Sequence, residues 1–157
     1  MPRIVRFAAT GMLVFVVTMG ALLPWAVYWI GLEGIDGRPD TIANERSADE
    51  VKTLWAAHEP NLPQGQLGSI SPYWMYYWLS CGFHLQACDW NKEYGGMSKM
   101  AGFVALTYMR DGHFRGKGMA HWHLTAVCLT IWIQRNMSSS DIVTAYVEAQ
   151  AHYQRKG

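Results

Sequence analysis

The first apolar stretch of the chain predicts a membrane-spanning helix. Residues 8–32 carry no charged side chain, and about 20 apolar residues in a helix are enough to cross the hydrocarbon core of a bilayer. We therefore predict a transmembrane helix over residues 7–32. Arg3 and Arg6 precede it, whereas acidic residues predominate in the segment that follows. Because positive charge stays on the cytoplasmic side of a spanning helix, residues 1–6 are expected in the cytoplasm.

A cleaved signal peptide is the alternative interpretation of this stretch. The apolar part of a signal peptide is about 7–15 residues long and is followed by small residues at the cleavage site. The stretch here is longer, and Trp25, Tyr28 and Trp29 lie at its far end, where aromatic rings would sit at the membrane–water interface. The pattern therefore favours an uncleaved anchor in a bacterial inner membrane, with the rest of the chain in the periplasm.

The polar pattern after the anchor divides the chain into a linker and one helical domain. Residues 33–46 are mostly polar and include two glycines and a proline, which is typical of a juxtamembrane linker. Residues 47–157 then follow helical spacing. Ser47 and Glu50 have the spacing of a capping box at a helix start, and a proline follows the last position of that helix.

An unusually aromatic segment, YWMYYWL, occupies residues 73–79. At helical spacing its apolar side chains form one stripe, and such a stripe most often packs into a core. The other interpretation is that Trp74, Tyr77 and Trp78 contact the membrane surface or a partner, because Trp and Tyr rings prefer interfaces. The sequence leaves both interpretations open.

Two further apolar runs predict the interior of the domain. Residues 97–109 form a mostly apolar helix, and residues 119–134 form a longer one that is too long for a strand and fits a central buried helix. Ser138, with Asp141 three residues later, predicts the start of a last helix. Strand-like alternation persists nowhere, so the predicted fold class is mainly α.

Composition adds few constraints on chemistry. The formal net charge is +1, which gives no support to a nucleic-acid partner. Cys81 and Cys88 would lie about 10 Å apart on one continuous helix, too far for a disulfide, although a break at Gly82 would bring them closer. A disulfide between them stays open, and Cys128 is expected to be a small buried apolar residue.

The order of several short motifs resembles a known domain. The motifs are Gly95-Gly96-Met97-Ser98-Lys99 at a helix start, a basic loop over residues 110–118, the helix end IQRN at 133–136, and SSSDIVTAY at 138–146. Over roughly residues 70–150 this order resembles the lysozyme-like glycosyltransferase (transglycosylase) domain of class A penicillin-binding proteins and their monofunctional relatives. The resemblance implies a lysozyme-like helical domain in the periplasm.

The resemblance also implies a set of ligand-binding residues. They would be Gly95, Gly96, Ser98 and Lys99 at the helix start, joined by Arg110, Arg115 and Lys117 of the basic loop. Arginine and lysine between glycines are suited to bind a diphosphate or a glycan carboxylate, although a solvated basic loop is the commoner explanation for such charges.

The catalytic acids of that family are the main departure. The family uses two carboxylates to activate the attacking hydroxyl and to assist the leaving group, roles that an apolar side chain cannot take. The position of the second acid holds Ala126, and the glutamate that ends the long helix is replaced by Gln134. For the first acid, only Glu59, Asp89 and Glu93 are candidates, and none lies in the family's sequence context.

A metal site is the weakest of the candidate chemistries. His121 and His123 are two residues apart, and on a helix they point in different directions. His113 would be a third ligand only if the helix began with an extended segment. No haem motif or further close ligand pair is present, so we expect no cofactor.

We therefore expect a single-pass inner-membrane protein whose domain is an inactive, transglycosylase-like accessory or scaffold subunit of a cell-envelope assembly. Its expected partners are membrane lipid, other membrane-protein subunits, and peptidoglycan or its lipid-linked precursor. The alternative hypothesis is an active peptidoglycan glycosyltransferase or glycan-cleaving enzyme that uses Glu59 or Glu93 as its acid.

Overall fold

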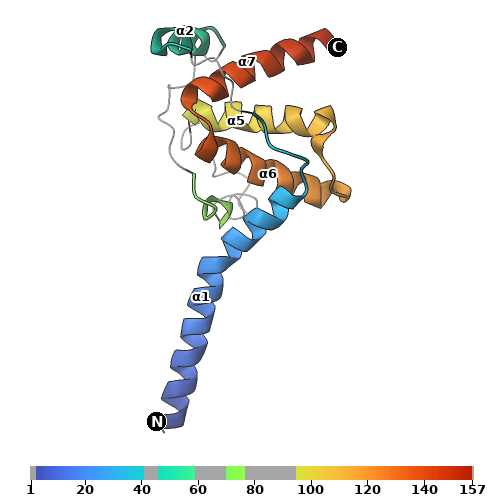
Figure 1. Ribbon diagram of the computed structural model, residues 1–157. Coiled ribbons are helices and arrows are strands. Elements are labelled where there is room, and N and C mark those ends of the chain that lie inside the picture. The colour runs from blue at the N-terminus through green and yellow to red at the C-terminus, as the bar shows by residue number, and fades with distance from the viewer. Residues whose placement is uncertain (1–2, 41–45, 59–69, 77–94, 157) are drawn as a thin grey trace, which may run out of the picture.

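The computed structural model describes residues 3–40, 46–58, 70–76 and 95–156, and these ranges are helical apart from turns and one isolated β-bridge. The helices are α1 (Arg3–Glu33), α2 (Ala48–His58), α5 (Gly95–Tyr108), α6 (Gly118–Asn136) and α7 (Ser139–Lys156), and a π-helical turn, η1 (Met109–His113), follows α5. In Figure 1, α5 lies between α6 and α7, and α1 projects away from the domain. The predicted mainly α fold class is confirmed.

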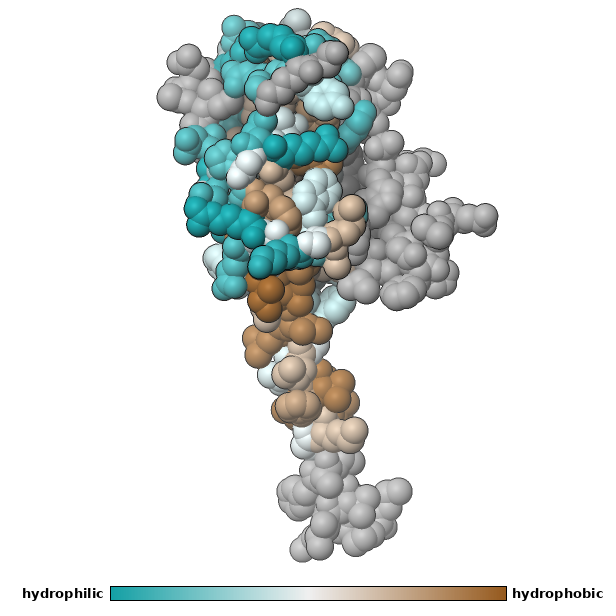
Figure 2. Space-filling view, turned by 90° about the vertical axis from the view of Figure 1, so that its right-hand side faces the viewer, coloured by the Kyte–Doolittle hydropathy of each residue, from teal (hydrophilic) through white to brown (hydrophobic). Residues whose placement is uncertain are grey.

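α1 has an exposed half and a packed half. Its large apolar side chains are exposed from Met12 to Leu23, whereas Tyr28 and Leu32 are buried. Figure 2 shows apolar side chains along the projecting part of α1 and polar side chains gathered over the domain. Within the described part of the chain, α1 is the one helix that is long and apolar enough to cross a membrane. The predicted helix over residues 7–32 is therefore present, but its last turns belong to the protein core.

α6 is the central helix of the domain and lies in two apolar clusters. On one side, Leu129 and Ile133 pack with residues of α2, α5 and α7. On another side, Cys128 and Ile131 pack with the packed half of α1 and with residues 70–76. The prediction of a central buried helix over residues 119–134 is confirmed, with bounds that extend by one or two residues at each end.

The joint between α6 and α7 is a reciprocal cap. The Ser138 backbone N–H donates to the Asp141 carboxylate at 3.0 Å, the Ser138 hydroxyl donates to the same carboxylate at 2.8 Å, and the Asp141 N–H donates back to the Ser138 hydroxyl at 3.1 Å. α2 begins in the same way at Ser47 and Glu50, and the backbone N–H of Ser47 lowers the pKa of the Glu50 carboxyl. Both predicted caps are confirmed, and they explain why each helix begins where it does.

Two glycines allow α1 to approach α6 closely. A Cβ atom added at Gly31 would overlap the Cys128 sulfur and lie 3.0 Å from the Cys128 Cβ atom, and one at Gly34 would lie 2.5 Å from the Thr125 hydroxyl oxygen. Cys128 is fully buried at this contact, and burial raises the pKa of its thiol to about 12. The thiol is therefore an apolar packing group, as expected from the sequence.

The close approach predicts that Gly31→Ala destabilises the protein. The added methyl group must displace Cys128 in a packed interior, which costs on the order of 1–3 kcal/mol. The measurement is the thermal unfolding of the full chain in detergent. Gly11→Ala is the matched control on the same helix, because a Cβ there meets nothing within 4 Å. Equal melting temperatures for the two variants would contradict the close contact.

Candidate functional site

The place where α1 enters the domain combines several unusual features. We call it the α1–α6 junction. It has three parts: residues 20–36, which form the later half of α1 and its exit; residues 70–76; and the first three turns of α6. Later residues of α1 contact earlier residues of α6, as the Gly31–Cys128 and Gly34–Thr125 pairs show. At the other end of the contact, the Arg135 guanidinium lies 5.3 Å from the ring centre of Trp25, a cation–π distance.

Pro24 interrupts the hydrogen bonds of α1 at this junction. A proline has no backbone N–H, so it cannot bond to the carbonyl four residues earlier, and its ring pushes that carbonyl aside. The carbonyl in question belongs to Gly20, and the Tyr76 hydroxyl donates a hydrogen bond to it at 2.5 Å. The Tyr73 hydroxyl donates to the neighbouring carbonyl of Ala21 at 2.9 Å. The Tyr76 hydroxyl therefore supplies the donor that the proline removes, and the Tyr73 hydroxyl adds a second hydrogen bond to the next carbonyl.

The chain leaving α1 is fixed to the loop that follows η1. The Asp36 N–H donates to the His113 carbonyl at 2.7 Å, and the Arg115 N–H donates to the Gly34 carbonyl at 2.9 Å. These bonds flank the antiparallel bridge between Ile35 and Phe114. We call this short pairing the brace. The described part of the predicted linker is thus attached to the domain, with Ile35 buried in its larger core.

Side chains reinforce the brace. The Arg115 guanidinium forms an ion pair with the Asp36 carboxylate, although both side chains are more than half exposed, so the pair adds little stability. The Tyr108 hydroxyl donates to the Asp36 carbonyl at 3.0 Å, and burial of the phenol raises the pKa of Tyr108. The backbone bonds are therefore the main attachment, and Arg115 is engaged there.

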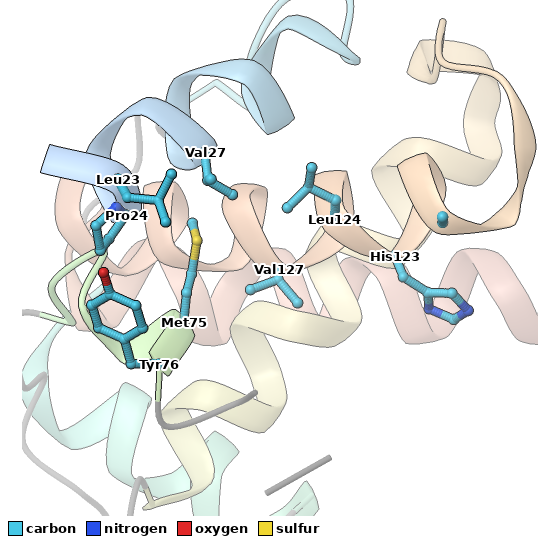
Figure 3. A pocket seen from close by; sticks show the side chains of 9 residues that line it. Leu23, Pro24, Val27, Met75, Tyr76, His123, Leu124 and Val127 are labelled. Carbon is cyan, nitrogen blue, oxygen red and sulfur yellow. The ribbon is translucent and has the colours of Figure 1, made fainter. Parts of the chain in front are cut away.

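An apolar cavity lies beside the α1–α6 contact. Its volume is about 570 Å³, and α1, the turn at residues 74–76 and α6 all contribute to its wall. Figure 3 shows the side chains that surround it: Leu23, Pro24, Val27, Met75, Tyr76, His123, Leu124 and Val127, together with Ala120. Such a volume falls within the range of ligand-binding cavities.

The ligand-binding residues predicted from the sequence do not form one site. Gly95, Gly96, Ser98 and Lys99 open α5, whereas Arg110, Arg115 and Lys117 follow it. α5 has 14 residues, so the two groups lie about 20 Å apart. Arg110 and Lys117 are exposed to solvent. The structure therefore places the two groups at opposite ends of α5.

The positions of the missing acids are filled by neutral packing groups. Ala126 is half-buried against the larger core, and Gln134 is buried with its Oε1 atom accepting a hydrogen bond from the Ser98 hydroxyl at 3.4 Å. The remaining acidic candidates, Glu59, Asp89 and Glu93, lie outside the described residues. The same holds for the cysteine pair Cys81 and Cys88.

The three histidines considered as metal ligands lie in different surroundings. The His113 ring stacks on Tyr108 with 3.9 Å between ring centres, His121 faces Gly34 and Gly116, and His123 is exposed at the edge of the cavity. Among the described residues no three His, Cys, Asp or Glu side chains are placed to hold a metal ion.

The aromatic segment forms hydrogen bonds to α1 through Tyr73 and Tyr76, which are not among the contact residues predicted from the sequence. Trp74 is half-buried against the smaller core cluster, which corresponds to the packing interpretation, and Tyr77 and Trp78 lie outside the described residues. Tyr73 and Tyr76 are the residues that reach α1. Pro24 indicates that a carbonyl of α1 needs another donor, but no local pattern shows that Tyr73 or Tyr76 is placed to supply one.

Comparison of the chain with protein-family models, with curated proteins and with solved structures finds no match. The transglycosylase resemblance therefore stays a hypothesis based on short motifs.

The donor–acceptor pairing at the bend predicts that Tyr76→Phe destabilises the protein by about 1–2 kcal/mol, since it leaves the Gly20 carbonyl without a donor. In a Pro24→Ala background the helix regains the N–H for this carbonyl, so the cost of Tyr76→Phe should fall toward zero. The measurement is a double-mutant cycle on the free energy of unfolding in detergent. Tyr153→Phe, at an exposed tyrosine of α7, serves as the control. The same cost in both backgrounds would contradict the pairing.

Proposed function

We propose that the protein is a single-pass inner-membrane protein whose helical domain acts in the periplasm as a non-catalytic accessory subunit of a cell-envelope assembly. The observation that carries the proposal is the continuity of α1, whose exposed apolar half runs without a break into a half that is packed in the domain core. A domain attached in this way cannot move freely on a tether. It is held at one height and orientation relative to α1, as suits a subunit that positions other proteins.

Two features of the domain favour an accessory role over catalysis. The helix that would carry the second acid of a transglycosylase has Ala126 and Gln134 at the relevant positions, and neither side chain can take or give a proton at neutral pH. The basic loop that would hold a diphosphate is engaged through Arg115 in the brace. Both features support a domain that retains a transglycosylase-like pattern without its chemistry.

An exposed apolar patch supports a protein partner. Met119, at the start of α6, is 71% exposed, the highest value outside α1 among the large apolar side chains described. It lines a second cavity of about 320 Å³ with Phe114, Gly118 and Trp122. A partner that covered Met119 and the half-buried Phe114 and Trp122 would remove this apolar surface from water. Through Phe114 the patch adjoins the brace, so a partner bound there would also contact the base of the anchor.

The orientation is tested with fusions to the full chain. Arg3 and Arg6, in the first turns of α1 and ahead of its apolar run, predict a periplasmic C-terminus. Alkaline phosphatase fused to the C-terminus should therefore be active in cells, whereas green fluorescent protein fused there should be dark. The same two reporters fused to the N-terminus are the matched control and should give the opposite result. An inactive phosphatase and a fluorescent protein at the C-terminus would reverse the proposed topology.

The accessory role predicts that Met119→Glu lowers the recovery of co-purifying membrane proteins when the tagged full chain is purified in mild detergent. A charge at the centre of an apolar contact is expected to weaken it by at least about tenfold. Met119→Leu keeps the apolar contact and is the control. Because Met119 is exposed, both variants should unfold at the same temperature as the wild-type protein. Unchanged recovery with Met119→Glu would remove the patch as a partner site.

Enzymatic assays test the other half of the proposal. Incubation of the full chain with the lipid-linked peptidoglycan precursor, and separately with purified sacculi, should give no turnover. Turnover that Glu59→Gln or Glu93→Gln abolishes would overturn the non-catalytic role and establish the enzymatic alternative.

A further inference from the structure

The cavity at the α1–α6 junction has an apolar interior and an accessible edge. Pro24 and Met75 are buried in its wall, whereas Ala120 and His123 are exposed. The polar side chains in the wall are those of Tyr76 and His123, and the Tyr76 hydroxyl already donates to the Gly20 carbonyl. Ordered water needs about two to four polar partners in a buried site. The cavity therefore offers little to water and favours an apolar occupant.

The size of the cavity argues against an ordinary packing defect. It is a cleft that opens at its exposed edge, and its volume of about 570 Å³ falls within the range of ligand-binding sites. Three separate parts of the chain contribute to its wall, and one of them, the turn at residues 74–76, is held on α1 by the tyrosine bond described above. The same hydrogen bond that satisfies the proline bend thus places Met75 and Tyr76 at the wall of the cavity.

The position of the cavity indicates where its occupant comes from. Leu23 lines the cavity and is 49% exposed, and it belongs to the row of exposed large apolar side chains that runs along α1 from Met12. The surface of the cavity is therefore continuous with the surface of α1 that would face lipid. This step rests on the proposed function, because it requires α1 to cross the membrane. An apolar chain could then enter from the bilayer without passing through water.

We propose that this cavity binds one fatty-acyl chain of a membrane phospholipid, inserted between α1 and α6. The chain contacts Leu23 and Val27 on α1 and Leu124 and Val127 on α6. Each methylene group moved from water to an apolar site contributes about 0.8 kcal/mol, but a chain that comes from the bilayer has already left water. The preference for the site therefore arises from shape and from filling of the cavity, and the bound chain stabilises the junction by mass action.

The experiment uses the full chain in nanodiscs made of phosphatidylethanolamine and phosphatidylglycerol. The probe is a phosphatidylethanolamine with a photoactivatable diazirine near the end of one acyl chain, and the labelled residues are identified by mass spectrometry. We expect labelling of Met75, Leu124 and Val127. Ala120→Phe, which places a ring into the cavity from its exposed edge, should lower this labelling by about tenfold. Ala151→Phe, at an exposed alanine of α7, is the matched control and should leave it unchanged.

A second variant and a second probe test whether the labelled lipid lies in the cavity and whether it is a phospholipid. Leu124→Trp fills the cavity from α6 and should lower the labelling of Met75 and Val127 in the same way as Ala120→Phe. Labelling confined to exposed α1 residues such as Phe15 and Val17, or labelling that neither variant changes, would overturn the proposal. Labelling of the cavity by a photoactivatable polyprenyl phosphate but not by the phospholipid would also overturn it. If α1 does not cross the membrane, alkaline carbonate will release the chain from vesicles, whatever the cavity binds. That result distinguishes a failure of the proposed anchor from a failure of the acyl-chain site.

Discussion

The close contact between α1 and α6 is the constraint on which the rest of the structure depends. α6 carries apolar side chains on more than one side, and α5 and α7 cover only part of them. Cys128 and Ile131 are covered by the packed half of α1, and the approach is possible because Gly31 and Gly34 have no side chains. The anchor is therefore also a component of the domain core. A domain without its last α1 turns would expose the apolar surface that those turns bury, which is costly in water.

Pro24 determines where the two halves of α1 meet. Before it the large apolar side chains of α1 are exposed. After it one face of the helix is packed, with Tyr28 and Leu32 buried, while Trp29 and Ile30 on the other face stay exposed. The bend that a proline imposes lies at this change. In a bilayer an unsatisfied carbonyl costs several kcal/mol, so the bend is tolerable only where donors are at hand. Tyr76 provides the donor for Gly20, and Tyr73 adds a bond to Ala21, both from a segment more than 50 residues later in the chain. The domain thus stabilises the helix that anchors it, and the helix in turn completes the core of the domain.

The elements that sequence could predict are those set by local chemistry. The apolar run of α1, the capping pairs Ser47–Glu50 and Ser138–Asp141, and the long apolar pattern of α6 each act within a few residues, and each appears where the pattern placed it. The contacts of the junction could not be predicted, because they join residues far apart in the chain. Polar composition made residues 33–46 look like a free linker, whereas the bridge from Ile35 to Phe114 depends on a partner that no local pattern reveals.

The basic, glycine-rich loop shows how one pattern fits two different roles. Glycines and cations together are typical of an anion site, but here the geometry of the brace accounts for them. Gly112 adopts a left-handed conformation with φ of 100°, which other residues rarely accept. A Cβ atom at Gly116 would lie 2.6 Å from the His121 ring and from Phe114. The loop needs these glycines to turn back and to pack its bridge residue against α6, whether or not any anion binds. Gly112, Gly116 and Arg115 are thus explained by the attachment of the loop to the exit of α1, and they give no independent support to a diphosphate site.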